Sequence, residues 1–411
     1  MGAGVMLLLT LGGCGLYGPR NGAVRAADRF EAGHPEALAI AERRASRAID
    51  LSPHDAESWA ARARVDHLYL LHPEHIAPHP DPVDRAVEAF GMAVELKVRG
   101  ASHGALARRA PSLVGASVVA LTDAGAREDW VRAQRLARVS LRAVQVAEAL
   151  GASADAYLEP LHRMGARAAA EQQDAAAAWS HYRGLTAVSD TLHPGLAVAV
   201  AQAVAQAGDP AGALGILVGV AEAQPVHEGV LRAQLALWRA QGQPHHALRR
   251  LEAVTPALKQ SVQGTMLAAE LTSAAGAAEL ARELWAHALS MDSGHFEAHL
   301  LLGDSLIVAA TALATELADS EELQTRRQSD ELRVQTDRLA ALWARGTAQL
   351  RAARLIDPTH PAPVRGLIRA LQARVRGVEP ELLQDAALAA HHADVASLRD
   401  LRNTLAELES R

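Results

Sequence analysis

The sequence is poor in cysteine and in aromatic residues, and it carries little net charge. Its 411 residues include 1 Cys, and 3% are aromatic. One cysteine excludes an intrachain disulfide and any zinc site built from several cysteines. The 41 Lys+Arg against 47 Asp+Glu give a net charge of −6, which argues against a nucleic-acid-binding protein. The low aromatic content is also atypical of β-sandwiches.

What the chain does contain is apolar and small. Hydrophobic residues make up 49% of it, mostly Ala, Leu and Val, so wholesale disorder is excluded. This composition favours helices that pack closely through small side chains. No phosphate-binding glycine loop, serine nucleophile elbow, His-Glu-x-x-His motif or calcium loop occurs. We therefore expect a protein that is not an enzyme and that uses no cofactor.

The 19 histidines include one group that could in principle gather around a metal ion. His72, His75 and His79 lie in a proline-rich stretch, and His67 lies just before it. Their spacing fits no standard zinc site, and a flexible loop seldom orients metal ligands without supporting contacts. We expect a solvated loop and no metal.

The middle of the chain repeats itself every 34 residues. Gly208, Gly242 and Gly276 mark the period, and Pro210 and Pro244 each follow a glycine at the start of a new helix. The second helix of each unit carries a small residue followed by a large one, which lets two helix backbones approach closely. These repeat-packing residues are Ala213, Leu217, Ala247, Leu251, Ala281 and Trp285.

A helix–turn–helix period of 34 residues resembles the tetratricopeptide repeat, abbreviated TPR. The resemblance implies an all-α fold, a TPR-like right-handed α-solenoid of about eight to nine helical hairpins with a C-terminal capping helix. Regular 34-residue units are expected at 191–306. Degenerate TPR-like hairpins are expected at 23–190, where the register within 100–190 stays open.

Two stretches depart from the repeat. Four prolines at 72–82 forbid a continuous helix, so a loop insertion is expected there. The segment 307–376 is expected to hold a TPR-like hairpin with an extended helix at 320–356, followed by one more repeat. Residues 377–411 are expected to form capping helices, whose polar outer face keeps a solenoid from sticking to its neighbours.

The single cysteine lies in a motif near the N-terminus. A short apolar run leads into Leu11-Gly12-Gly13-Cys14, which resembles the lipidation site of a bacterial lipoprotein. The run is too short to span a bilayer. The resemblance implies a signal peptide at 1–14, lipidation of Cys14 and a short linker at 15–22. Because Gly15 replaces the aspartate typical of inner-membrane retention, it implies an outer-membrane lipoprotein that faces the periplasm.

In the TPR family the first helix of each hairpin lines an inner groove, where partners bind. Carried over residue by residue, the groove positions are Arg64, His67, Gln202, Gln206, Arg232, Arg239, Glu270, Asp304, Arg365 and Arg369. Paired guanidinium groups on such a surface suit the capture of carboxylates. The alternative is that these arginines only keep an alanine-rich surface soluble.

Together these patterns predict a bacterial TPR lipoprotein. We expect a lipid-anchored scaffold that binds a protein or peptide partner in the cell envelope. The alternative is a ligand-binding accessory component of a TRAP-type periplasmic transport system. A closed apolar pocket would favour a small ligand, and an open groove would favour a peptide.

Overall fold

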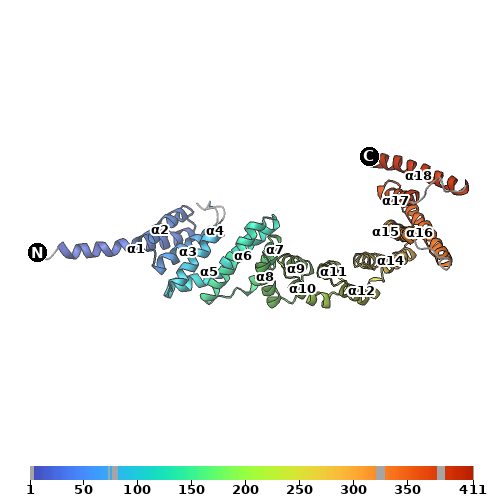
Figure 1. Ribbon diagram of the computed structural model, residues 1–411. Coiled ribbons are helices and arrows are strands. Elements are labelled where there is room, and N and C mark those ends of the chain that lie inside the picture. Colours follow the sequence, from blue (N-terminus) through green and yellow to red (C-terminus); the bar gives the residue numbers. More distant parts are fainter. Residues whose placement is uncertain (1–3, 73–74, 76–81, 321–328, 377–384, 411) are drawn as a thin grey trace. The chain divides into compact units, whose positions relative to one another are not determined.

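The computed structural model describes residues 4–72, 75, 82–320, 329–376 and 385–410. Over these ranges the chain forms eighteen helices and no strand. Figure 1 shows them as successive coiled ribbons coloured along the sequence. Consecutive helices contact each other in pairs, which gives nine helical hairpins. The prediction of an all-α solenoid of TPR-like hairpins is confirmed.

The hairpins cluster by their contacts into two compact units, Met1–Ala223 and Gln224–Arg411. Unit 1 holds α1 (Gly4–Glu31), α2 (Ala37–Leu51), α3 (Ala56–Leu71), α4 (Pro82–Glu95), α5 (Gly100–Ala126), α6 (Trp130–Ala149), α7 (Asp155–Glu171), α8 (Ala175–Val188), α9 (Pro194–Gln206) and α10 (Pro210–Ala223). Unit 2 holds α11 (Glu228–Ala240), α12 (Pro244–Leu258), α13 (Val262–Ala274), α14 (Ala278–Met291), α15 (Phe296–Ser320), α16 (Ser329–Ile356), α17 (Pro361–Arg376) and α18 (Asp385–Glu409).

Odd-numbered helices pack on one another within each unit. In unit 1, α1 contacts α3, α3 contacts α5, α5 contacts α7, and α7 contacts α9. In unit 2, α11 contacts α13, and α15 contacts α17. In each unit we call the outer surface of these first helices the first-helix face of that unit.

The turns inside the three hairpins of the 34-residue period share one backbone form. Gly208, Gly242 and Gly276 all have positive φ angles, of 95°, 69° and 90°. In each case the N–H of this residue and the N–H of the next residue bond back to carbonyls of the preceding helix, as in a Schellman motif. The three glycines of the 34-residue period therefore occupy equivalent bends.

The same bend recurs without glycine in the stretch whose register the sequence left open. Glu128 and Gln173 both have a φ of 57°, and they end α5 and α7 with the same pair of backbone hydrogen bonds. The residue that follows each of them, Asp129 or Asp174, accepts a hydrogen bond from the backbone at the start of the next helix. These two bends set the register of α5–α8.

Burial confirms that register. Five alanines stand five residues after their bends and are wholly buried in the second helices: Ala133, Ala178, Ala213, Ala247 and Ala281. Leu217, Leu251 and Trp285, four residues further along, are also buried. A small side chain at this position lets the two helices of a hairpin approach, and the large one fills the space beside it.

The N-terminal helix covers two segments that the sequence separates. The expected linker at 15–22 lies inside α1, because this helix runs into the packed residues Ala23, Ala26 and Ala27. Residues 4–14 of the expected signal peptide belong to the same helix. The expected change from degenerate to regular repeats near 190 is a property of the sequence and stays a prediction, whereas the compact units divide after Ala223.

The departures from the repeat fall partly outside the described residues. α3 ends at Leu71 and α4 begins at Pro82, and most of the proline-rich segment between them is not described. The predicted extended helix at 320–356 is described from Ser329 onward as α16. One capping helix is described at the C-terminus, α18, whose leucines are half-buried against α17.

One described helix is long and apolar enough to cross a membrane by length and composition, at Phe296–Leu317 in α15. It also packs against α14, α16 and α17, and Leu302, Leu306 and Ala310 are buried there, although only 28% of the apolar window is buried. A single helix of this length and composition is weak evidence for a membrane span.

The bends allow a direct test of the register. Gln173→Gly should raise the free energy of unfolding by about 1 kcal/mol, because glycine adopts a positive φ without steric cost. Gly208→Ala should lower it by about the same amount. Urea unfolding followed by circular dichroism measures both changes.

The neighbouring Gln172→Gly variant is the matched control, since Gln172 has a φ of −90°. Glycine there should only destabilise the helix end. If Gln173→Gly and Gln172→Gly lower the stability equally, the bend at Gln173 is not strained as described.

Candidate functional site

Two predicted groove residues, Arg64 and His67, lie on α3 in unit 1. The Arg64 guanidinium contacts Asp28 at 2.7 Å and Glu31 at 2.5 Å, both on α1. Arg109 on α5, which the sequence did not single out, donates to the other oxygen of Glu31 at 2.7 Å. The first-helix face therefore brings two arginines from neighbouring helices onto one carboxylate.

His67 differs from the expectation, because its side chain is buried instead of lining an open surface. Its Nε2 lies 2.7 Å from the Ser112 hydroxyl on α5. Burial, with a smaller effect from the Arg109 guanidinium, lowers the pKa of His67 to about 4. The imidazole is therefore neutral near pH 7, and it ties α3 to α5.

The two glutamines predicted for the groove, Gln202 and Gln206, lie on α9 and are exposed. Their helix packs through Ala197, Val200 and Ala201, which are fully buried. Exposed amides on a firmly packed helix supply both donors and acceptors to a partner.

In unit 2 the predicted groove residues pair with each other. Arg232 on α11 bonds to Glu270 on α13 at 2.7 Å and also to Glu228 at 2.8 Å. Arg369 on α17 bonds to Asp304 on α15 at 2.8 Å. These pairs link successive first helices.

The expected free arginine pairs are therefore not found in unit 2. Arg365 donates to Glu409 of α18 at 2.6 Å. Arg239 is exposed, and within the described part of the chain no ion pair engages it. The guanidinium groups are mostly neutralised because carboxylates of adjacent helices stand within their reach. Each such exposed pair contributes only about 0–1 kcal/mol, so a ligand can exchange with it at small cost.

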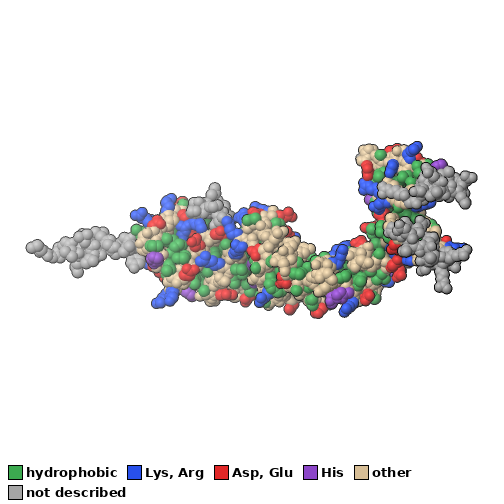
Figure 2. Space-filling model, in the orientation of Figure 1, with side chains coloured by type: hydrophobic (Ala, Val, Ile, Leu, Met, Phe, Trp, Pro, Cys, Tyr) green, Lys and Arg blue, Asp and Glu red, His purple; other side chains and the backbone are tan. Residues whose placement is uncertain are grey.

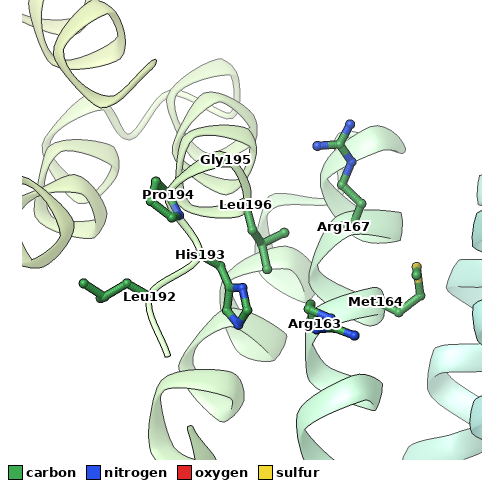
Figure 3. Close-up of a pocket in the computed structure, with 8 residues that line it drawn as sticks. All are labelled: Arg163, Met164, Arg167, Leu192, His193, Pro194, Gly195 and Leu196. Carbon is green, nitrogen blue, oxygen red and sulfur yellow. The ribbon is translucent and has the colours of Figure 1, made fainter. Parts of the chain in front are cut away.

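A pocket of about 420 Å³ opens in unit 1 between α7 and the start of α9. Figure 3 shows the side chains that line it, with His193 and Leu196 lying across from α7. The lining residues are Arg163, Met164, Arg167, Leu192, His193, Pro194, Gly195 and Leu196. The pocket therefore combines two guanidinium groups, both about half exposed, with an apolar floor.

Sequence reasoning missed Arg163 and Arg167 because the register of α7 was open. Counted back from the bend at Gln173, Arg167 holds the position of Gln202 and Glu270 in their helices. By the same count Arg163 holds the position of Arg232. The signal that would have found them is the helix-capping aspartate, Asp174, which aligns with Asp209.

Another charged cluster is buried inside the first hairpins, away from the first-helix face. Arg62 contacts Glu42 at 2.9 Å and Asp66 at 2.8 Å, and Arg85 contacts the same two carboxylates. Burial raises the pKa of Asp66, and the Arg62 guanidinium opposes that shift. These ion pairs join α2, α3 and α4, so we assign the cluster a structural role. Replacing one of its members would leave the opposite charges buried without a partner, which is destabilising.

The histidines in and before the proline-rich stretch are the remaining candidates for a metal site. Among the described residues no group of three or more His, Cys, Asp or Glu could hold a metal ion. His72 and His75 instead pack edge-on against Phe30, and His79 lies outside the described residues.

Acidic and basic side chains are intermingled on the visible face of unit 1, as Figure 2 shows. This mixing agrees with the ion pairs between neighbouring helices and with the small net charge of the chain.

No protein-family model and no curated protein matches the chain. Among solved structures it is similar to PilF of Pseudomonas aeruginosa, at 14% identity and a TM-score of 0.26, over 62% of this chain and 99% of that one. A tetratricopeptide repeat protein from Parabacteroides merdae is 12% identical with a TM-score of 0.26, over 69% and 97% of the two chains.

The P58(IPK) TPR domain is 12% identical with a TM-score of 0.25, over 88% and 99% of the two chains. The solved structures that the chain resembles are thus TPR proteins. At these identities the likeness concerns the helical-hairpin fold alone, and the fold itself rests on the hairpins and bends described above.

The buried histidine predicts a pH dependence. His67 titrates near 6.5 when unfolded and near 4 when folded, so the unfolded chain binds more protons between these values. Stability should therefore fall as the pH drops from about 6.5 to about 4, by up to roughly 3 kcal/mol from this group. His67→Gln should remove most of that loss in urea unfolding at pH 7 and pH 4.5.

His245→Gln is the control, because His245 is exposed on α12. It should leave the pH dependence as in the unmodified protein. An identical loss of stability in His67→Gln and in the unmodified protein would contradict a depressed pKa at His67.

Proposed function

We propose that this protein is a non-enzymatic, lipid-anchored TPR scaffold that binds a protein partner in the bacterial cell envelope. The observation that carries the proposal is that each unit has a first-helix face with exposed polar or charged side chains. Gln202 and Gln206 are exposed on the first-helix face of unit 1, and Arg239 is exposed on that of unit 2. Such a surface presents a fixed pattern of donors and acceptors to an extended partner.

The pocket between α7 and α9 favours a peptide over a small enclosed ligand. Half-exposed arginines edge it, so a bound group would remain open to solvent on one side. Met164 and Leu196 provide apolar contact beside the two guanidinium groups. An acidic residue next to an apolar one in a peptide matches this chemistry. The TRAP-type accessory role calls for a closed apolar cavity instead.

The lipid anchor rests on the motif that ends in Cys14. Two acyl chains on this residue would hold the protein durably at a membrane, where one chain gives only marginal binding. With Gly15 after the cysteine, we place the anchor in the outer membrane with the solenoid in the periplasm. A tethered scaffold of this kind would keep its partner close to the membrane.

The partner-binding face is tested by reversing one charge on it. Arg239→Glu should abolish or strongly reduce recovery of the partner when the acylated protein is pulled down from membranes, because a carboxylate repels an acidic partner. Quantitative mass spectrometry of the recovered proteins measures the change.

Arg249→Glu is the matched control, because Arg249 is an exposed arginine on the second helix α12. It should leave recovery unchanged. Equal recovery with both variants would reject the first-helix face of unit 2 as the contact surface.

The anchor is tested by Cys14→Ser. Expressed in a Gram-negative host, the unmodified protein should fractionate with the outer membrane and incorporate labelled palmitate. The variant should incorporate none and appear in the soluble fraction, because hydroxyl replaces the acylated thiol. Palmitate in the variant, or its absence from the unmodified protein, would contradict lipidation at Cys14.

A further inference from the structure

One ion-pair cluster on the first-helix face differs from all the others described. The Glu31 carboxylate ends α1, and it receives Arg64 of α3 on one oxygen and Arg109 of α5 on the other, at 2.5 and 2.7 Å. Asp28, one turn earlier on α1, adds a second contact to Arg64. One acidic side chain is therefore held between guanidinium groups from two helices.

The two sides of this cluster are unequally exposed. The Arg64 and Arg109 side chains are 14% and 22% exposed, whereas Glu31 is 37% and Asp28 57% exposed. On unit 2 the arginine of a comparable pair is far more open, at 60% for Arg369. Arg64 and Arg109 thus lie deeper than the carboxylates that pair with them, and we call these two arginines the recessed site. Glu31 and Asp28 contact it from the more exposed side.

The recessed site offers one more hydrogen-bond donor than the chain itself uses. Arg64 Nε is buried without a hydrogen-bond partner among the described residues. Buried polar groups are normally paired, so an unpaired guanidinium N–H indicates that the donors of Arg64 are not all used by Glu31 and Asp28.

Glu31 lies outside the contacts that pack the helix that carries it. α1 is packed by Ala23, Ala26, Ala27 and Phe30, all buried, and none of them contributes to the ion pairs. Glu31 is the last residue of α1 and is followed by the turn at Gly33, so the core contacts of α1 do not themselves hold the carboxylate on the two arginines.

We propose that Arg64 and Arg109 form a binding site for an acidic side chain of the partner protein, and that Glu31 occupies it as an internal competitor. This inference rests on the proposed scaffold function and adds the chemistry of one contact. Exchange is chemically matched, because the incoming carboxylate takes over the two guanidinium contacts that Glu31 gives up.

The test uses the full chain and a fluorescein-labelled peptide of six glutamates, followed by fluorescence anisotropy. Glu31→Gln should bind this peptide about tenfold more tightly than the unmodified protein, because the neutral amide competes poorly for two guanidinium groups. Glu31→Asp, which keeps the charge on a shorter side chain, should give a smaller gain. A peptide of six glutamines should bind to none of them.

Glu95→Gln is the matched control, since Glu95 on α4 also pairs with an arginine, Arg142 on α6, but both lie on second helices away from the first-helix face. It should leave affinity for the glutamate peptide unchanged. Adding Arg64→Gln and Arg109→Gln to Glu31→Gln should remove the gain. Thermal unfolding of each variant shows whether α1 stays packed.

The proposal is overturned if Glu31→Gln and Glu31→Asp bring no gain, or if the gain survives loss of both arginines. In that case Glu31 is only a link between helices, and its variants should merely lower stability. The Arg239→Glu pull-down is independent of this site, so loss of partner there without a gain here rejects the internal competitor and leaves the scaffold function standing.

Discussion

The structure depends on the close approach of two helices in each hairpin. That approach requires a wholly buried small side chain at one position of the second helix, as at Ala133, Ala178, Ala213, Ala247 and Ala281. It also requires a bend in which one residue adopts a positive φ and returns two backbone hydrogen bonds to the helix before it. In the hairpins that have both features, they fix how the chain reverses from the first helix to the second.

The stacking decides what the first-helix face can be. Where two first helices contact each other, as α11 contacts α13 and α15 contacts α17, a long side chain on one reaches a carboxylate on the next. Arg232 with Glu270 and Arg369 with Asp304 are such links, and both join residues that sequence reasoning had placed in a groove. Most charged side chains on these faces are therefore paired. The positions of the pairs follow from the way in which the first helices stack.

The sequence predicts the fold well where glycine marks the bends. Gly208, Gly242 and Gly276 give the period, and the alanines and leucines that follow them are buried as expected. The sequence does not reveal the bends at Glu128 and Gln173, because residue types other than glycine do not indicate a positive φ. Only the aspartate that caps the next helix marks these bends, and it is too common a residue to stand out alone.

For the candidate residues, the sequence predicts which helix face each one lies on, but not which residues contact it. A helical period places Arg64 on a face, but it cannot show that Glu31 and Arg109, distant in sequence, meet it there. His67 was assigned to the same face, yet it is buried because α5 lies over it. Arg163 and Arg167 were missed for a different reason, since the register of α7 was unknown.

These ion pairs change how a partner would be recognised. A surface whose charges are already paired attracts an acidic ligand weakly at long range, so affinity comes from exchanging one carboxylate for another and from apolar contact. Exchange alone discriminates poorly, because each incoming carboxylate replaces one of equal chemistry. Discrimination between partners would then come from sites that accept a bound carboxylate in one geometry only. Such sites are the recessed arginines Arg64 and Arg109 and the apolar contacts beside Met164 and Leu196.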